Sequence, residues 1–427
     1  RPHTHSGLFT SRMKYDILIT SVPKMDKDKP APGPAYLKSF LESKGKRVKI
    51  IDGNQIEDLN KLAIIIDQYE FDWLGISVFS YLQHDAALEL GSQFDRVVYG
   101  GPGINRDWTE GNYIRGEGEY ALLEFLNGNM NYPGINGIPH IQIDDINNLP
   151  APDYSDYLEQ HTYNSMVLSG SRGCVRDCTF CDVANLWPKF RFVDGQKLAD
   201  MMHEVAKKSG VDAISFSDSL VNGSMKQFRA LCQALADNPK KILWNGQFIA
   251  RKENTFSPQD FDNLANSGCV SLTIGIESGS ETVRHHMRKK FSNEDIDWFL
   301  SNLISRNIHV KILLFVGYPT ETVEDFAQTK ALLTKYSQHA EKLSVSMDIM
   351  RIEHDTPIEY DHGDLYEGDG QNWYNKISNY ETRLQRYLEL FDHAKALGFN
   401  FPYHAENKRQ RFVEYLKNKD TVITGVI

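Results

Sequence analysis

The chain of 427 residues is long enough for two or three domains, each with its own hydrophobic core. Hydrophobic residues make up 41% of it and charged residues 24%, which is typical of a globular enzyme and excludes a disordered or fibrous chain. The formal net charge of −10 argues against a protein built mainly to bind nucleic acid, and no apolar run approaches the ~18 residues of a membrane span.

The cysteines and the N-terminus indicate a compartment. Three of the five cysteines lie within residues 174–181 and two lie far away, which does not resemble a disulfide framework and fits a reducing interior. Residues 1–12 are polar and lack the apolar core of a secretory signal, so we interpret them as a lead before Met13. We therefore expect a cytoplasmic protein that is not exported.

The first part of the chain alternates strand and helix patterns. Strands are predicted at 15–20, 47–53, 71–80 and 96–103, and helices at 35–45, 59–69 and 83–94. This order predicts an α/β fold with a doubly wound, Rossmann-like parallel sheet, whose ligands bind at the carboxyl ends of the strands. Ser77, Ser80, Gly100 and Gly101 stand at those ends.

A second series of strand and helix patterns follows a linker rich in Gly, Pro and Asn at 128–157. Strands are predicted at 166–170, 212–217, 242–248, 270–276, 309–316 and 343–350, and helices at 195–210, 224–237, 257–268 and 322–336. Six such units favour a partial (β/α)6 barrel of the TIM type, because a closed eight-stranded barrel needs ~250 residues.

The remainder of the chain departs from this pattern. It begins with an acidic, aromatic and turn-rich segment at 351–375, which we interpret as an ordered acidic loop that covers the mouth of the barrel. Its aromatic residues Tyr360, Tyr366, Trp373 and Tyr374 are candidates for lining a substrate pocket. An amphipathic helix follows at 380–398, which predicts a mainly α C-terminal extension. We predict three domains, at 13–150, 151–350 and 351–427.

The stretch "SGSRGCVRDCTFCDV" at 169–183 carries Cys174, Cys178 and Cys181 with the spacing C-x3-C-x2-C, directly after the first strand of the second series. Three thiolates can hold three irons of a cubane cluster and leave the fourth iron open to a small molecule. Structural zinc requires four ligands, and the nearest downstream histidine, His203, lies inside a predicted helix. The other alternative is three structural thiols.

This stretch resembles the signature loop of the radical S-adenosylmethionine (SAM) enzymes, including an aromatic residue, Phe180, before the last cysteine. The resemblance implies a [4Fe-4S] cluster on the three cysteines, with SAM on the open iron. One electron would cleave SAM reductively to a 5′-deoxyadenosyl radical, so we expect a one-electron reductant such as flavodoxin or ferredoxin as a partner.

Further positions extend the resemblance to the SAM site. In "SFSDSL", Ser217 and Asp218 match the position that holds the SAM amino group, although the family usually has Gly-Gly-Glu there, so Asp218 is the residue that carries over. The other matched residues are Arg251 for the SAM carboxylate, Glu277 and Ser278 for the ribose or methionine, and Gly317 against adenine. For each of them a capping or packing role is the alternative.

Residues 13–150 resemble the cobalamin-binding domain that precedes the barrel in one large subgroup, through "GISVFS", "YGGPGIN" and "YIRGEGEYALLEFL". In that subgroup, Ser77, Ser80, Gly100 and Gly101 would cradle the nucleotide tail of cobalamin. The D-x-H-x-x-G histidine that ligates cobalt in some cobalamin proteins is absent here. The alternative is a scaffold that binds no cobalamin and shapes the substrate cleft.

The leading functional hypothesis is a cobalamin-dependent methyltransferase that acts on an unactivated carbon of a small-molecule or peptide substrate. The alternative within the same fold is radical rearrangement, cyclisation or oxidation without methyl transfer. An iron–sulfur sensor is a third hypothesis, against which the SAM-side motifs count. We interpret the basic run "RHHMRKK" at 284–290 as a solvated helix end.

Overall fold

The computed structural model describes residues 13–23 and 27–424, so the polar lead predicted at 1–12 lies outside the described residues. The chain forms two compact units, one comprising Arg1–Leu168 with Met201–Ala213 and the other Ser169–Asp200 with Ile214–Ile427. The three-domain division stays a prediction. None of the helices in the described ranges is long and apolar enough to cross a membrane.

The first unit contains a five-stranded parallel sheet in the order β2-β1-β3-β4-β5. Its strands are β1 (Lys14–Ser21), β2 (Val48–Ile51), β3 (Glu70–Ser77), β4 (Val97–Gly100) and β5 (Asn112–Ile114). The helices are α1 (Pro32–Ser43), α2 (Leu59–Ile66), α3 (His84–Gly91), α4 (Gly118–Leu126) and α5 (Ser155–Gln160), with 3-10 turns η1 (Gly53–Gln55), η2 (Tyr81–Gln83) and η3 (Ile146–Asn148). The predicted doubly wound sheet is confirmed. The sequence pattern did not predict β5, whose 3 residues are too few for a periodic signal, or α4, which follows β5 in the chain.

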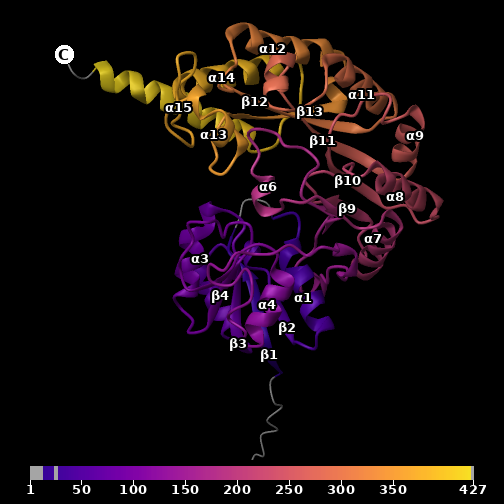
Figure 1. Ribbon diagram of the computed structural model, residues 1–427, viewed down its shortest axis with the longest axis vertical. Helices are drawn as coiled ribbons and strands as arrows, with labels where there is room; N and C mark the ends of the chain where they lie inside the picture. The colour runs from indigo at the N-terminus through magenta and orange to yellow at the C-terminus, as the bar shows by residue number, and fades with distance from the viewer. Residues whose placement is uncertain (1–12, 24–26, 425–427) are drawn as a thin grey trace, which may run out of the picture. The chain divides into compact units, whose positions relative to one another are not determined.

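The second sheet has six strands in the order β13-β12-β11-β10-β9-β6, and it stays open as the predicted partial barrel requires. Its strands are β6 (Met166–Leu168), β9 (Ala213–Phe216), β10 (Leu243–Phe248), β11 (Cys269–Glu277), β12 (His309–Val316) and β13 (Leu343–Ile349). The helices between them are α7 (Gly195–Ser209), α8 (Met225–Asp237), α9 (Pro258–Asn266), α10 (Glu281–His286), α11 (Asn293–Ser305) and α12 (Val323–Tyr336), followed by the 3-10 turn η4 (Ser337–Lys342). Figure 1 shows α8, α9, α11 and α12 along the outer side of this curved sheet.

Local sequence signals set where several of these helices begin. Capping boxes, in which a Ser or Thr and an acidic residue three positions later bond each other's backbone N–H, open α9, α11 and α12. The pairs are Ser257 with Asp260, Ser292 with Asp295, and Thr322 with Asp325. Each cap therefore fixes the residue at which the preceding loop ends and the helix begins.

The C-terminal extension is mainly helical, as predicted, and consists of α13 (Pro357–Asp361), the 3-10 turn η5 (Gly363–Leu365), α14 (Tyr380–Ala396) and α15 (Ala405–Thr424). It belongs to the second unit, and α14 packs on β12, β13 and α12. The interpretation of its aromatic residues as a pocket lining is wrong for Trp373, which is 0% exposed and donates its Nε1–H to the carbonyl of Met350.

A buried ion pair ties α14 to the carboxyl end of β12. Glu321 is fully buried, and its Oε2 accepts hydrogen bonds from the backbone N–H of Gly317 at 2.7 Å and from Nη1 of Arg386 at 2.8 Å. Its Oε1 has no hydrogen-bond partner among the described residues. Burial raises the pKa of Glu321 to about 7, although Gly317 and Arg386 act in the opposite direction.

Glu321 is expected to make the stability of the chain depend on pH. Because its pKa is higher in the folded than in the unfolded chain, its contribution is complete below the ordinary carboxyl pKa and is lost as the pH rises toward 7. The unfolding free energy of the wild type minus that of Glu321→Gln should fall between pH 4.5 and 7.5 by on the order of 3 kcal/mol. Urea unfolding of both chains across this range measures it, and a difference that stays constant with pH would contradict it.

Candidate functional site

The three predicted cysteines lie on a loop whose two ends lie side by side. A two-stranded antiparallel ribbon, β7 (Ser171–Arg172) and β8 (Arg191–Phe192), follows β6 and closes the base of this loop, and α6 (Val183–Leu186) begins just after its last cysteine. We call residues 173–190 the cysteine loop. Gly173 opens it with a φ of +85°, and a Cβ there would lie 2.6 Å from the carbonyl oxygen of Lys189. Only glycine therefore allows this closure.

The thiols of Cys174, Cys178 and Cys181 are all half-buried. Burial raises the pKa of Cys178, and it raises that of Cys181 to about 11, with the neighbouring thiols of the loop adding to the effect. All three thiols lie within eight residues of one loop, so the donor set suits a cluster held by three thiolates. Within the described ranges, no three His, Cys, Asp or Glu side chains are arranged as ligands of one metal ion.

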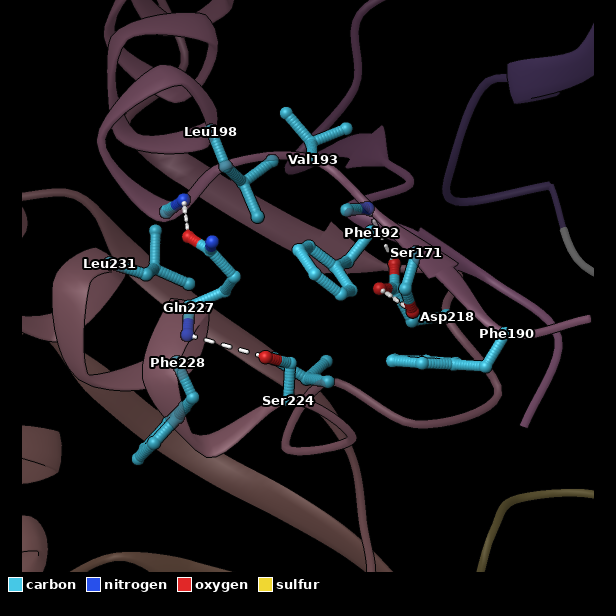
Figure 2. A pocket seen from close by; sticks show the side chains of 13 residues that line it. Ser171, Phe190, Phe192, Val193, Leu198, Asp218, Ser224, Gln227, Phe228 and Leu231 are labelled. Atoms are coloured by element: carbon cyan, nitrogen blue, oxygen red, sulfur yellow. Dashed lines mark hydrogen bonds between the residues drawn. The ribbon is translucent and has the colours of Figure 1, made fainter. Parts of the chain in front are cut away.

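Asp218 anchors the start of the cysteine loop. Its Oδ1 accepts the backbone N–H of Gly170 at 2.8 Å, and its Oδ2 accepts the hydroxyl of Ser171 at 2.6 Å. Figure 2 shows this contact at the edge of a small pocket whose apolar lining is Phe190, Phe192, Val193, Leu198, Val221, Phe228 and Leu231. Burial raises the pKa of Asp218 to about 6. Both carboxylate oxygens thus have protein partners, and contact with the SAM amino group stays a prediction.

Two other predicted SAM residues lie at the same edge of the sheet. Ser217 is exposed and its hydroxyl lies 2.6 Å from that of Ser169. Arg251 donates from Nη2 to the carbonyls of Asn222 at 2.5 Å and Gly223 at 3.1 Å. Its Nε is buried and has no hydrogen-bond partner in the described part of the chain. This N–H could therefore donate a hydrogen bond to a carboxylate.

The SAM residues predicted on β11 and β12 have protein partners. Glu277, at the end of β11, pairs with Lys289 at 2.8 Å. Ser278 is fully buried, and its carbonyl accepts a hydrogen bond from Arg284 at 2.7 Å. A Cβ at Gly317 would lie 2.3 Å from the Cγ of Arg383, so packing by itself requires a glycine at this position. Roles for these residues toward SAM stay predictions.

Phe180 and its neighbour in the cysteine loop face the protein interior. The Phe180 ring meets the ring of Phe315 edge-on at 4.9 Å between centroids, within a core cluster that also contains Trp373. Thr179 is fully buried, and its hydroxyl lies 2.8 Å from that of Tyr318. The carbonyl of Thr179 also accepts the backbone N–H of Ile358 from the C-terminal extension at 2.7 Å.

The interpretation of residues 284–290 as a solvated helix end holds for the exposed His285 and Lys290 but is wrong for Arg284 and Lys289. Arg284 is 0% exposed, and Lys289 is buried against Glu277 with only 12% of its side chain exposed. Lys290 bonds Asp177 in the cysteine loop at 3.0 Å. Lys290 and Asp177 are 113 residues apart and form no local sequence pattern, so the sequence could not predict their ion pair.

The predicted cobalamin residues lie at the carboxyl edge of the first sheet. Ser80 caps η2 in a capping box with Gln83, so its hydroxyl is used within the chain. Gly101 has a φ of +113°, and a Cβ there would lie 2.5 Å from the carbonyl of Val78, so its glycine is required by packing. Ser77 is half-buried.

Gly100 and the loop after β3 combine an uncrowded backbone with exposed apolar side chains. The atom nearest to a Cβ built at Gly100 is the carbonyl oxygen of Ile114 at 3.9 Å, so packing does not require a glycine there. In the loop, Phe79, Tyr81 and Leu82 expose 65%, 51% and 77% of their surface. A glycine without close neighbours and three exposed apolar side chains suit contact with a large, partly apolar ligand such as a corrin.

Comparison with known proteins gives one family match. The sequence profile of the radical SAM superfamily matches residues 168–333. A curated protein of Methanocaldococcus jannaschii, described only as uncharacterised, is 26% identical over 264 residues, 58% of this chain and 56% of that protein. Cytidylyl-2-hydroxyethylphosphonate methyltransferase of Streptomyces wedmorensis is 28% identical over 38% of this chain and 31% of its own length. The chain thus spans about half or less of these relatives.

Solved structures share the fold over most of the chain. The methyltransferase TsrM of Kitasatospora setae, solved with cobalamin and a [4Fe-4S] cluster, has a TM-score of 0.66 at 16% identity, covering 81% of this chain and 77% of its own. The cobalamin-dependent enzyme OxsB has a TM-score of 0.64 at 17% identity over 81% of this chain and 55% of its own. At these identities the similarity concerns the fold alone.

Proposed function

We propose that the chain, whose residues 168–333 match the radical SAM superfamily, is a [4Fe-4S] enzyme that cleaves SAM reductively and, with cobalamin, methylates an unactivated carbon. The observation that carries this proposal is the placement of three half-buried thiols on one loop at the carboxyl edge of the open barrel. The substrate class is a small molecule or a peptide, and the partner is a one-electron reductant of the flavodoxin or ferredoxin type.

When bound, these groups would supply one-electron cleavage of a first SAM to methionine and a 5′-deoxyadenosyl radical that takes a hydrogen atom from the substrate, and a methyl group for the substrate carbon. The methyl group would come from a second SAM by way of the corrin and leave S-adenosylhomocysteine, so that the whole reaction would consume two electrons. Cys174, Cys178 and Cys181 would hold the cluster. Arg251 would bind the SAM carboxylate through its unpartnered Nε–H, and Asp218 would hold the base of the cysteine loop in place.

The edge of the first sheet supports cobalamin binding through Gly100 and the exposed Phe79, Tyr81 and Leu82. A second candidate function is radical chemistry without methyl transfer, with this unit as a scaffold. It is favoured by Ser80 and Gly101, because the chain's own packing accounts for both residues.

Anaerobic reconstitution with iron, sulfide and cobalamin, followed by iron and corrin quantitation and a 5′-deoxyadenosine assay, tests both parts. The variant Gly100→Phe adds a ring at a position where a Cβ meets no atom closer than 3.9 Å, so it should lower retained corrin by at least about tenfold while iron and SAM cleavage persist. Glu42→Phe is the matched control, because Glu42 is exposed near the end of α1, at the opposite edge of the sheet.

The outcomes separate the two parts of the proposal. A wild type that forms 5′-deoxyadenosine but never retains corrin would leave radical SAM cleavage standing and remove methyl transfer. A reconstituted wild type that forms no 5′-deoxyadenosine with SAM and a strong reductant would contradict the proposal as a whole.

A further inference from the structure

The segment 286–290 lies against the cysteine loop. The backbone N–H of Thr179 donates to the carbonyl of Met287 at 3.2 Å, and Lys290 bonds Asp177. Arg288 forms a second ion pair at 2.6 Å with Asp361, at the end of α13. We call residues 287–290 the basic clasp. The clasp therefore connects the cysteine loop to the C-terminal extension within the second unit.

The clasp and its partner carry unusual backbone conformations. Arg288, Lys290 and Glu277 have φ values of +61°, +58° and +69°, although none of them is glycine. Such residues cost about 1–2 kcal/mol each and persist where the surroundings hold them. The register of β11 on β12 also shifts between Gly275 and Glu277. The paired side chains of Glu277 and Lys289 lie within these two stretches of backbone.

Lys289 is the buried cation of the clasp. Its Nζ lies 2.8 Å from Oε1 of Glu277, donates to the carbonyl of Gly275 at 3.2 Å, and stands 5.2 Å from the ring centroid of Phe180. The side chains of Lys289 and Glu277 are only 12% and 10% exposed. A Cβ at Gly275 would lie 2.3 Å from Oε1 of Glu277, so that glycine makes room for the pair.

The charge of Lys289 lies beside the cysteine loop. Its Nζ stands 5.2 Å from the ring centroid of Phe180, which directly precedes Cys181 in the loop. The backbone hydrogen bond from Thr179 to Met287 holds this part of the loop, which carries the sulfurs of Cys178 and Cys181, against the clasp. Solvent screens a buried cation only weakly, so its field at these sulfurs persists in salt.

We infer that Lys289 is a positioning residue that holds a positive charge against the cysteine loop and so favours the uptake of one electron by a cluster on Cys178 and Cys181. The inference rests on the proposed function, because it requires a cluster on these cysteines. Reduction adds one negative charge to the cluster, and nearby charge is among the factors that set the reduction potential of iron–sulfur centres. The electron comes from the one-electron reductant, and no bond is made or broken in this step.

The test is a redox titration of the reconstituted chain without SAM or substrate, with the reduced cluster counted by electron paramagnetic resonance. Lys289→Met should lower the ratio of reduced to oxidised cluster at a fixed potential by about tenfold, which corresponds to about 59 mV for one electron. Lys290→Met removes the same charge from an exposed neighbour and should change the ratio less than about threefold. Lys289→Arg should stay close to the wild type.

A double variant separates the charge of Lys289 from that of its partner. Lys289→Met alone leaves Glu277 uncompensated, whereas Lys289→Met with Glu277→Gln leaves the pair neutral as in the wild type. If Lys289 acts on the cluster directly, the double variant keeps a ratio at least about threefold below the wild type. A return to the wild-type ratio would overturn the inference.

Further outcomes also decide the inference. If Lys289→Met does not load iron, restoration of loading by Lys289→Arg supports it, and failure to restore loading contradicts it. Equal ratios in Lys289→Met and the wild type would overturn the inference and leave the proposed function intact. A wild type that forms no cluster would overturn both.

Discussion

Replacing Cys178 with alanine is expected to abolish both the cluster and SAM cleavage. Three thiolates are the whole protein contribution to the proposed cluster, so the loss of one leaves two irons of the cubane without a protein ligand. Loss of an outer-shell partner already costs about 10–100-fold in metal affinity or activity, so loss of a ligand should lower 5′-deoxyadenosine formation by more than about 100-fold. Iron content after anaerobic reconstitution should fall with it.

Cys232→Ala is the matched control for this experiment. Cys232 is fully buried in α8, outside the cysteine loop, and burial raises the pKa of its thiol to about 12. Its loss should cost some packing energy and leave iron content and SAM cleavage at the wild-type level. If Cys178→Ala retained its iron and still formed 5′-deoxyadenosine, the assignment of the cluster to this loop would be wrong.

Gly317→Ala is expected to destabilise the second unit strongly even without SAM. Gly317 has a φ of +82°, and a new Cβ would lie 2.3 Å from Cγ and 2.5 Å from Cδ of Arg383. Arg383 has little freedom to move, because it is fully buried, donates to the carbonyls of Gln371 and Trp373, and stacks on the Trp373 ring at 3.9 Å. The left-handed conformation and the overlap together should cost about 2–5 kcal/mol.

Urea unfolding of the metal-free chain measures this cost, and Gly370→Ala serves as its control. Gly370 also has a left-handed φ, +53°, but nothing lies within 4 Å of its Cβ position, so only the conformational part of about 1–2 kcal/mol should remain. Equal losses in the two variants would show that Arg383 yields to the new methyl group. A loss that appears only with SAM present would instead support the predicted contact with adenine.

The order of strands and helices followed from the sequence because it depends on short-range patterns. Apolar periodicity, capping residues and glycines predicted both parallel sheets, and the confirmed open six-stranded sheet is the predicted partial barrel. The pattern failed where it was too short, as for the 3 residues of β5. The roles of single residues at the site could not be predicted from the sequence as well, because a Gly or Asp at the end of a strand can serve packing as readily as ligand binding.

The spacing of Cys174, Cys178 and Cys181 and their position after a barrel strand were determined by the sequence itself, because both are local features. Only the tertiary structure decided what surrounds them: Asp218 bonds the base of the loop, and Lys289 faces it beside Glu277. These partners are brought together by the packing of strands whose register depends on the whole sheet. A contact such as that between Lys290 and Asp177, 113 residues apart, has no counterpart in any local pattern of residues.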